Sequence, residues 1–333
     1  MLVVQNDTNF PAYATLGGHL PLTATIFSGE PVRWLAQIVV KATYAVSPDG
    51  VAVPDDDQLP IVAQDEETEN GLAPGELALE KGGVDIVVIG SARAPAGRAV
   101  RELTVELRIG GWSRLLQVTG DRFWQRAGAS WLPTEPVPFQ QMPLDYKRAF
   151  GGVYRSPEGA EIGYARNPLG KGWNPISAAV MDFSGRPLPN IESPGERLTT
   201  PSDEPVPAGF AAYPIHWALR LEHGVRQTAA GNPVLLPRLW NSAHPACVMD
   251  SYPQDSVCSL SGMTAEGRFI CTAPRPAFYL EHALCGASEQ LAAQPDLLCL
   301  LPDQQRLFTL TRWLVPIDMT DREVSRQVRI CRT

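Results

Sequence analysis

The sequence predicts a mainly β protein, with antiparallel sheets arranged as a sandwich or a distorted barrel, long Pro/Gly-rich loops and few short helices. Proline and glycine contribute 31 and 28 of the 333 residues, which leaves little room for long helices between them. The segments between these residues are short and rich in β-branched or alternating apolar side chains. Both features are typical of sheets whose strands are connected by turns.

The clearest strand runs from Glu102 to Ile109. Its apolar residues occupy every second position, which predicts one buried and one exposed face. Gly110 and Gly111 then predict a tight hairpin into a second strand. The further strands are expected at 34–46, 84–90, 113–119, 267–273 and 306–317.

Other segments are predicted to be less regular. Pro316 is expected to break the last strand near its end, and Pro295 limits the helix formers of 289–301 to a short helix at most. Residues 55–71 are charged and lack aromatic residues, which predicts a solvated loop. Residues 133–214 are rich in Pro, Gly and Asn, so their backbone must be satisfied by turns and side-chain hydrogen bonds.

The chain divides into an N-terminal β-rich part, residues 1–130, and a second part, residues 131–333. The second part holds a motif-rich loop region and a C-terminal β-rich segment. A chain of this length is sufficient for one large or two ordinary domains. We expect the two parts to pack as one continuous domain.

The composition is that of a soluble globular protein, with 44% hydrophobic and 19% charged residues. A net charge of −8 disfavours nucleic acid as a partner, because phosphate binding requires clustered Lys and Arg. The apolar runs are too short for membrane insertion, and the N-terminus lacks a signal-peptide pattern. We therefore expect a cytoplasmic protein.

All six cysteines lie in the last quarter of the chain, and we expect reduced, mostly buried thiols. Two pairs, His244 with Cys247 and His282 with Cys285, share the spacing H-x-x-C. Such pairs can close a tetrahedral zinc site, but in a region this rich in Cys the spacing is more often accidental. No metal and no cofactor are expected.

Four ordered blocks carry most of the information: residues 120–152, 167–172, 187–192 and 207–210. They place charged residues beside large aromatics and turn formers, as a buried polar corner requires. Arg122 and Arg148 are expected to be buried or semi-buried anchors. The candidate motif or partner-binding residues are Asp121, Arg122, Trp124, Asp145, Tyr146, Arg148, Phe150, Gly151, Gly152, Asn167, Gly170, Gly172, Trp173, Phe183, Asn190 and Glu192.

The enzyme signatures of zinc proteases, serine hydrolases and phosphate-loop proteins are absent from the sequence. Asp121, Asp145 and Glu192 nevertheless permit a carboxylate-dependent hydrolase that acts on carbohydrate or peptidoglycan. Cationic neighbours of Asp121 and Asp145 are expected to lower the carboxyl pKa, which favours structural bridges over a general acid. No catalytic residue is therefore assigned.

The ordered blocks resemble those of a bacterial family, the domain of unknown function 2169, and the resemblance extends from about Val39 to about Pro274. It implies a non-enzymatic chaperone or adaptor of type VI secretion. The implied partners are a toxin effector and the spike or spike-tip protein onto which the effector is loaded. A structural component of the secretion machine is a further alternative. Trp173 and Phe183, as exposed-looking aromatics in the 133–214 region, are the expected client-binding anchors.

Overall fold

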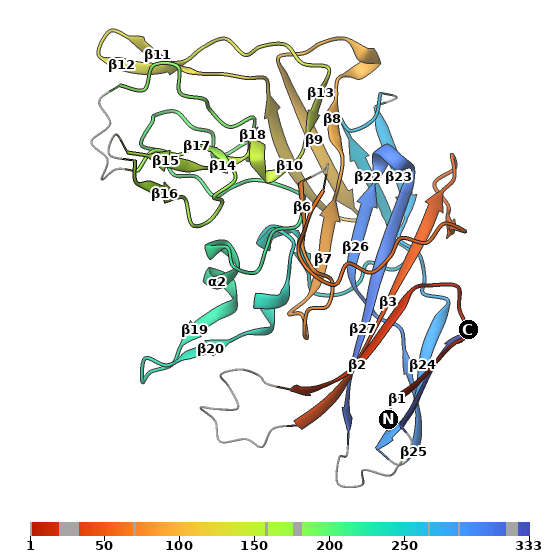
Figure 1. The fold of residues 1–333 in the computed structure, drawn as a ribbon. Coiled ribbons are helices and arrows are strands. Elements are labelled where there is room, and N and C mark those ends of the chain that lie inside the picture. The colour runs from red at the N-terminus through yellow and green to blue at the C-terminus, as the bar shows by residue number, and fades with distance from the viewer. Residues whose placement is uncertain are drawn as a thin grey trace.

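The computed structural model describes residues 2–19, 33–68, 71–156, 159–175, 182–265, 267–285, 287–317 and 326–333. Three large sheets and several two-stranded ribbons make up the structure (Figure 1). Most strand pairs are antiparallel, and none of the large sheets closes into a barrel in the part of the chain that the structure describes. The predicted mainly β class is confirmed, and the open sheets fit the sandwich alternative.

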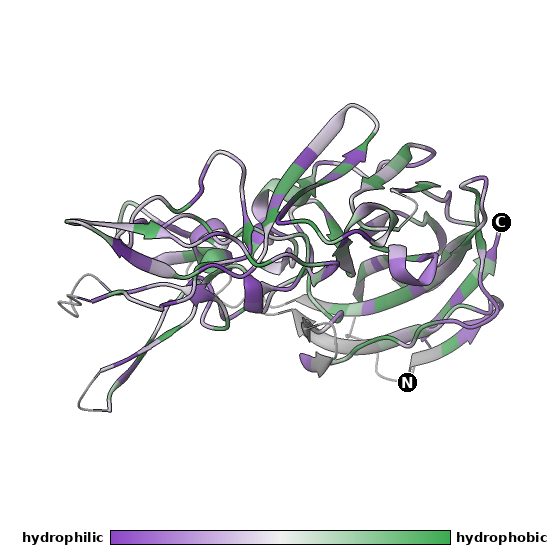
Figure 2. Ribbon diagram, turned by 90° about the horizontal axis from the view of Figure 1, so that it is seen from above, coloured by the Kyte–Doolittle hydropathy of each residue, from purple (hydrophilic) through white to green (hydrophobic). Residues whose placement is uncertain are grey.

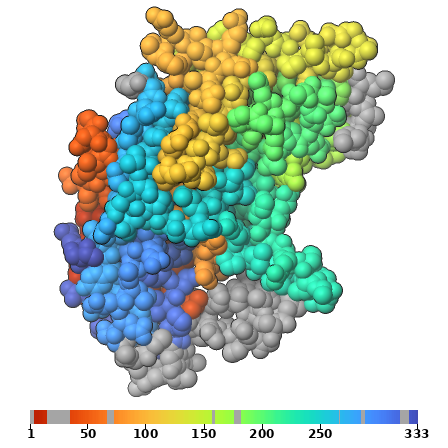
Figure 3. All heavy atoms as spheres, turned by 180° about the vertical axis from the view of Figure 1, so that it is seen from behind, coloured from red at the N-terminus to blue at the C-terminus, as the bar shows by residue number. Residues whose placement is uncertain are grey.

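The largest sheet has seven strands in the order β2-β3-β27-β26-β7-β21, with β4 paired to β3. It combines strands from both ends of the chain, because the long β3 and β27 pair over their whole lengths. Seen from behind, C-terminal segments in blue lie beside N-terminal segments in red and orange (Figure 3). Its strands are β2 (Ala12–His19), β3 (Arg33–Val46), β4 (Ala52–Pro54), β7 (Val84–Val88), β21 (Val248–Met249), β26 (Pro295–Leu301) and β27 (Arg306–Ile317).

The two other large sheets have five and four strands. The five-stranded order is β18-β10-β9-β22-β23, and the four-stranded order is β1-β28-β24-β25. The five strands are β9 (Glu102–Ile109), β10 (Trp112–Thr119), β18 (Ile191–Glu192), β22 (Val257–Ser261) and β23 (Arg268–Thr272). The four strands are β1 (Leu2–Asn6), β24 (Phe278–Cys285), β25 (Ala287–Ala292) and β28 (Arg326–Arg332).

The remaining elements are short. The α-helix that the described residues contain, α2 (Ala218–Gly224), has seven residues. The two-stranded ribbons are formed by β5 (Glu66–Thr68), β6 (Gly71–Ala73), β8 (Ser91–Arg93), β11 (Trp124–Ala127), β12 (Ser130–Pro133), β13 (Gln141–Pro143), β14 (Phe150–Gly151), β15 (Val153–Arg155), β16 (Glu161–Gly163), β17 (Lys171–Gly172), β19 (Val225–Gln227) and β20 (Pro233–Leu235). The 3₁₀ turns are η1 (Pro95–Gly97), η2 (Tyr146–Arg148), η4 (Pro237–Trp240), η5 (Pro245–Cys247) and η6 (Pro302–Gln304).

The predicted hairpin of β9 and β10 is confirmed. Val105, Leu107 and Ile109 of β9 are buried, whereas Glu102 and Arg108 are exposed. The Gly110 turn has a φ of 53°, a conformation that glycine adopts without steric cost. Viewed from above, hydrophobic and hydrophilic residues alternate along several of the strands (Figure 2). The period-two pattern thus marks strands with one buried face.

Two C-terminal segments differ from what the sequence indicated. Residues 289–301 form no short helix but contribute to β25 and β26, and Pro295 begins β26. The run from Leu297 to Leu301 is buried, so burial within the sheet overrides helix propensity. Pro316 does not break β27, which continues to Ile317. Pro316 lies opposite Leu35 of β3, beyond Thr311, where the pairing of β27 with β26 ends.

Residues of all three large sheets share one hydrophobic core. Ile38 of β3, Leu107 of β9 and Leu280 of β24 belong to it, and each is fully buried. The predicted state of the thiols is confirmed for the described side chains, since Cys247, Cys258, Cys271, Cys299 and Cys331 are free and buried.

The segment after β4 is held on the sheet by buried polar side chains of β3. Lys41 Nζ donates to the Pro60 carbonyl at 2.9 Å and lies 2.6 Å from Glu76 Oε1. Gln37 Nε2 donates to the Ala78 carbonyl at 2.6 Å. Leu59 and Ile61 also pack against the core. The expected solvated loop at 55–71 is therefore only partly correct, because its middle is anchored to the sheet.

We expect Glu76→Ala to destabilise the protein by about 3–5 kcal/mol, because it leaves the Lys41 ammonium buried without its counter-charge. The free energy of unfolding in urea measures this effect. Glu161→Ala is the matched control: it removes an ion pair to Arg155 of the same 2.6 Å length, but with side chains 78% and 56% exposed. Exposed pairs contribute little, so equal losses in the two variants would contradict the assigned role of Lys41.

Candidate functional site

Arg122 and Glu192 form a buried ion pair at the β18 edge of the five-stranded sheet. Arg122 Nη2 lies 2.6 Å from Glu192 Oε2, and the two side chains are 5% and 1% exposed. The same nitrogen donates to the Pro189 carbonyl at 2.9 Å, while Glu192 Oε1 accepts the Leu198 amide at 2.8 Å. Arg197 Nε lies 3.6 Å from Glu192 Oε2. These partners offset the desolvation of both charges, and Arg122 is buried as predicted.

Asn190 connects this corner to Asp121. Its Nδ2 donates to the Thr119 carbonyl at 2.9 Å and to Asp121 Oδ1 at 3.0 Å. Lys171 Nζ lies 3.2 Å from the same carboxylate oxygen. The Asn190 hydrogen bond, helped by the positive charge of Lys171, holds the pKa of Asp121 below its usual value despite partial burial. Asp121 is therefore suited to a structural bridge rather than to a general acid.

Asn167 organises the glycine-rich turns that follow η2. It is fully buried, and its Nδ2 donates to the carbonyls of Tyr146 and Phe150 at 2.8 and 3.0 Å. A Cβ atom on Gly170 would lie 2.5 Å from that same nitrogen, so only glycine fits there. Three further glycines of the blocks have φ values of 145°, 113° and 98°: Gly151, Gly152 and Gly172. The blocks thus encode a tightly packed, irregular backbone.

The block aromatics fill a second hydrophobic cluster. Trp124 and Phe150 are buried in it, and Trp173 and Phe183 are half-buried against it. The Phe183 ring meets Trp131 edge-on at 5.6 Å, and Trp173 Nε1 donates to Glu204 at 3.0 Å. The interpretation of Trp173 and Phe183 as exposed is therefore wrong, because large aromatics gain most by covering such a cluster.

Tyr146 and Arg148 belong to η2, and Asp145 precedes it. Tyr146 is buried and meets the Tyr213 and Trp217 rings edge-on at 5.7 and 5.5 Å. Arg148 is half-buried, as predicted. Burial raises the pKa of Asp145, against the attraction of Arg148, so the expected lowering of that pKa is wrong. The desolvation of this carboxyl group outweighs the attraction of the neighbouring cations.

The two H-x-x-C pairs belong to different parts of the fold. His244 precedes η5 and Cys247 ends it, whereas His282 lies in β24 of the four-stranded sheet. Within the ranges that the structure describes, no three His, Cys, Asp or Glu residues are placed to hold a metal ion. The side chain of Cys285 lies outside the described residues, so its part of the hypothesis stays untested.

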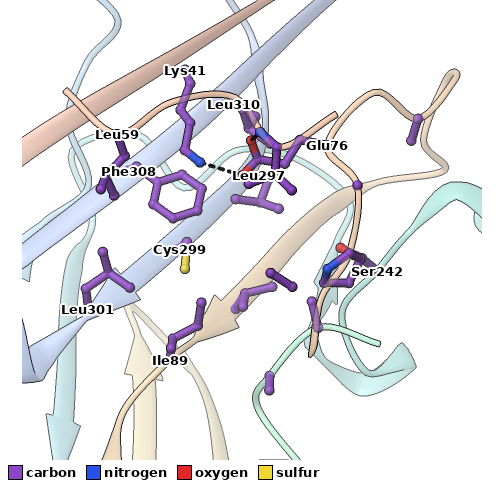
Figure 4. A pocket seen from close by; sticks show the side chains of 18 of the residues that line it. Lys41, Leu59, Glu76, Ile89, Ser242, Leu297, Cys299, Leu301, Phe308 and Leu310 are labelled. Carbon is purple, nitrogen blue, oxygen red and sulfur yellow. Dashed lines mark hydrogen bonds and ion pairs between the residues drawn. The ribbon is translucent and has the colours of Figure 1, made fainter. Parts of the chain in front are cut away.

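An apolar pocket of about 240 Å³ lies between the sheet and the segment that Lys41 anchors (Figure 4). Phe308 and Leu310 of β27 and Leu297 and Cys299 of β26 line it, together with the Lys41–Glu76 pair. Its volume is below the roughly 300 Å³ at which small-molecule sites begin. It suits one apolar side chain rather than a large ligand.

A second cavity, of about 230 Å³, is lined mainly by α2, η4 and the chain between η4 and β21. We call it the basic pocket, because three of its lining side chains are basic and none is acidic. The lining residues are Tyr213, Arg220, His223, Arg238, Asn241, Ala243, Pro245 and Val248. Asp121, Asp145 and Glu192 line neither of these two cavities.

Neither of these two cavities was predicted from the sequence. Lys41 carried a usable signal, since a lysine within the apolar run Ile38–Ala42 indicates a buried, paired charge. Arg220 and Arg238 carried none, because the β19–β20 ribbon separates them along the chain and only the fold places both at one cavity. None of the helices in the described ranges has the length and apolar character needed to cross a membrane.

A comparison with known protein families identifies the family to which the chain belongs. Residues 33–312 match the model of a family described as an uncharacterized protein conserved in bacteria, DUF2169. The chain belongs to this family, since the match covers most of its length. Neither the curated proteins nor the solved structures include a match.

We expect Arg122→Ala to cost about 2–4 kcal/mol of folding free energy, because it leaves the buried Glu192 with only the more distant Arg197 as a counter-charge. The double variant Arg122→Met with Glu192→Met should recover a large part of this loss, since neither charge remains to be desolvated. Urea unfolding of the single and double variants measures both. An unchanged stability of Arg122→Ala would show that the corner is not structural.

A pH effect is expected at His244. Burial, with the nearby charges of Arg114 and His223, lowers its pKa from 6.5 to about 3. Between these values the unfolded chain binds the proton that the folded protein excludes, so stability falls as pH falls below 6.5. At pH 5 the loss relative to pH 7 is about 2 kcal/mol.

His244→Gln should remove this part of the pH dependence, measured as the difference in unfolding free energy between pH 7 and pH 5. His216→Gln is the matched control, because His216 is exposed. An equally steep pH dependence in His244→Gln and in the wild type would contradict the assignment.

Proposed function

We propose that this protein is a non-enzymatic chaperone or adaptor that binds a type VI secretion toxin effector and helps to load it onto the spike or spike-tip protein. The observation that carries the proposal is the ordered set of blocks, from Gly120 to Phe210, in a chain that belongs to the DUF2169 family. The blocks resemble those of members associated with such effectors.

The hydrogen bonds and ion pairs of the block side chains are compatible with a binding protein. Asp121, Asn167 and Glu192 are engaged in backbone contacts or ion pairs. Groups committed in this way hold the fold and are poorly placed to transfer protons. The described part of the same region forms an irregular surface, and irregular surface segments often carry binding residues.

Exposed apolar side chains on this surface are the best candidates for the client contact. Val153 and Ile162 of the β15–β16 ribbon are 49% and 45% exposed, and Leu169 is 43% exposed. Each is a large hydrophobic residue in the 133–214 region, and such residues in protein interfaces contribute by burial. They replace Trp173 and Phe183, which are needed for the second cluster.

The triple variant Val153→Ser, Ile162→Ser, Leu169→Ser is expected to reduce co-purification of the effector encoded by the neighbouring gene at least about tenfold. Its melting temperature should stay close to that of the wild type, because the three side chains are exposed. The matched control is Val51→Ser, Val53→Ser, Val257→Ser, at positions that are 50%, 47% and 57% exposed.

Loss of the client in the first triple variant but not in the control would support this surface. Equal retention in both would exclude it and direct the search to an exposed sheet edge. Failure of the wild-type chain to co-purify any protein encoded beside it would contradict the adaptor function itself.

A further inference from the structure

Arg220 is a buried cation without a carboxylate partner among the described residues. It is 5% exposed, and the described residues include no Asp or Glu within ion-pair distance of its guanidinium. One Nη atom donates to the Tyr213 carbonyl, and the guanidinium carbon lies 5.5 Å from the centre of the Tyr213 ring. Its Nε has no hydrogen-bond partner in the described part of the chain. A buried charge in this state is unfavourable unless a further partner binds it.

The nearby buried acid, Asp85, cannot serve as that partner. Its Oδ2 accepts from Lys81 Nζ at 2.8 Å and from the Ser242 amide at 2.8 Å. Its Oδ1 accepts from Asn241 Nδ2 at 3.0 Å and from the Ala243 amide at 3.2 Å. The acceptor capacity of this carboxylate is therefore used by other donors.

The positive character of the region extends beyond Arg220. Arg238 and His223 also line the basic pocket, and Arg238 has as its described partner Asp250, at 3.5 Å, whose side chain is almost fully exposed. A weak solvent-exposed pair of this kind leaves the guanidinium available to a stronger acceptor. The pocket thus offers two guanidinium groups and one imidazole to whatever enters it.

Arg114 and His244, which lie beside the pocket, also carry hydrogen-bond donors that lack an acceptor among the described residues. His244 Nδ1 accepts the Ala246 amide at 3.1 Å, so the proton of the neutral ring is on Nε2. That Nε2–H faces Arg114 Nη2 at 3.5 Å, and two donors cannot satisfy each other. Arg114 Nε also lacks a described partner. Arg114 and Arg220 both act electrostatically on Tyr146, so they add positive potential to the same part of the interior.

We propose that the basic pocket binds an oxyanion group, a carboxylate or a phosphate, with Arg220 as its buried partner and Arg238 and His223 at its more exposed side. A guanidinium matches the planar fork of two oxygen atoms. The cavity of about 230 Å³ is far larger than the roughly 30 Å³ of one water molecule, so it has room for such a group. This inference does not depend on the adaptor function.

Calorimetric titration of the full-length chain with inorganic phosphate and with acetate tests the proposal, against chloride at equal ionic strength. Saturable binding of at least one oxyanion is expected. Stronger binding of phosphate would indicate a phosphorylated or free phosphate ligand, and stronger binding of acetate would indicate a peptide carboxylate. The absence of saturable binding by both probes would overturn the proposal.

Arg220→Gln and Arg238→Gln should each weaken the bound oxyanion about tenfold or more, because a charge-assisted hydrogen bond is lost. Arg275→Gln is the control, since it removes the same charge at an exposed ion pair with Asp255. If circular dichroism shows that Arg220→Gln is unfolded, Arg238→Gln and His223→Gln decide the test. Wild-type affinity in the folded variants of the pocket would refute the site.

Discussion

The Arg122–Glu192 ion pair is the contact on which the irregular half of the molecule depends. It joins the start of the block region to β18, and through Pro189 and Leu198 it also holds the backbone on both sides of that strand. Residues 133–214 have few ladder hydrogen bonds of their own, so buried side chains must satisfy their backbone groups. In the same way, the side-chain amides of Asn167 and Asn190 donate hydrogen bonds to backbone carbonyls of neighbouring turns.

Other buried ion pairs also attach segments of the chain to the sheets. Lys41 and Glu76 hold the segment after β4, and Lys81 with Asp85 joins the start of β7 to the chain around Ser242. Each of these charges has its counter-ion and further hydrogen bonds, as burial requires. Arg220 is the exception, and this contrast is the reason for treating the basic pocket as a site rather than as part of the scaffold.

The proposed function and the proposed site describe different parts of one molecule. The block region would present exposed apolar side chains to a client, while the basic pocket at α2 would take a single anionic group. Membership of the DUF2169 family connects the chain to a conserved bacterial architecture without assigning either role. The two proposals stand on separate residues, and each can fail without the other.

The sequence by itself determined the mainly β class, the β9–β10 hairpin and the burial of Arg122, because these follow from local patterns. Alternation fixes which face of β9 is buried, and a charge placed among aromatics must be paired. Tertiary structure alone decided that 289–301 is strand, because neighbouring strands supply the hydrogen bonds and the burial that outweigh helix propensity. It also decided the partial burial of Trp173 and Phe183 and the convergence of Arg220 with Arg238, since these depend on contacts between segments whose separation along the chain carries no periodic signal.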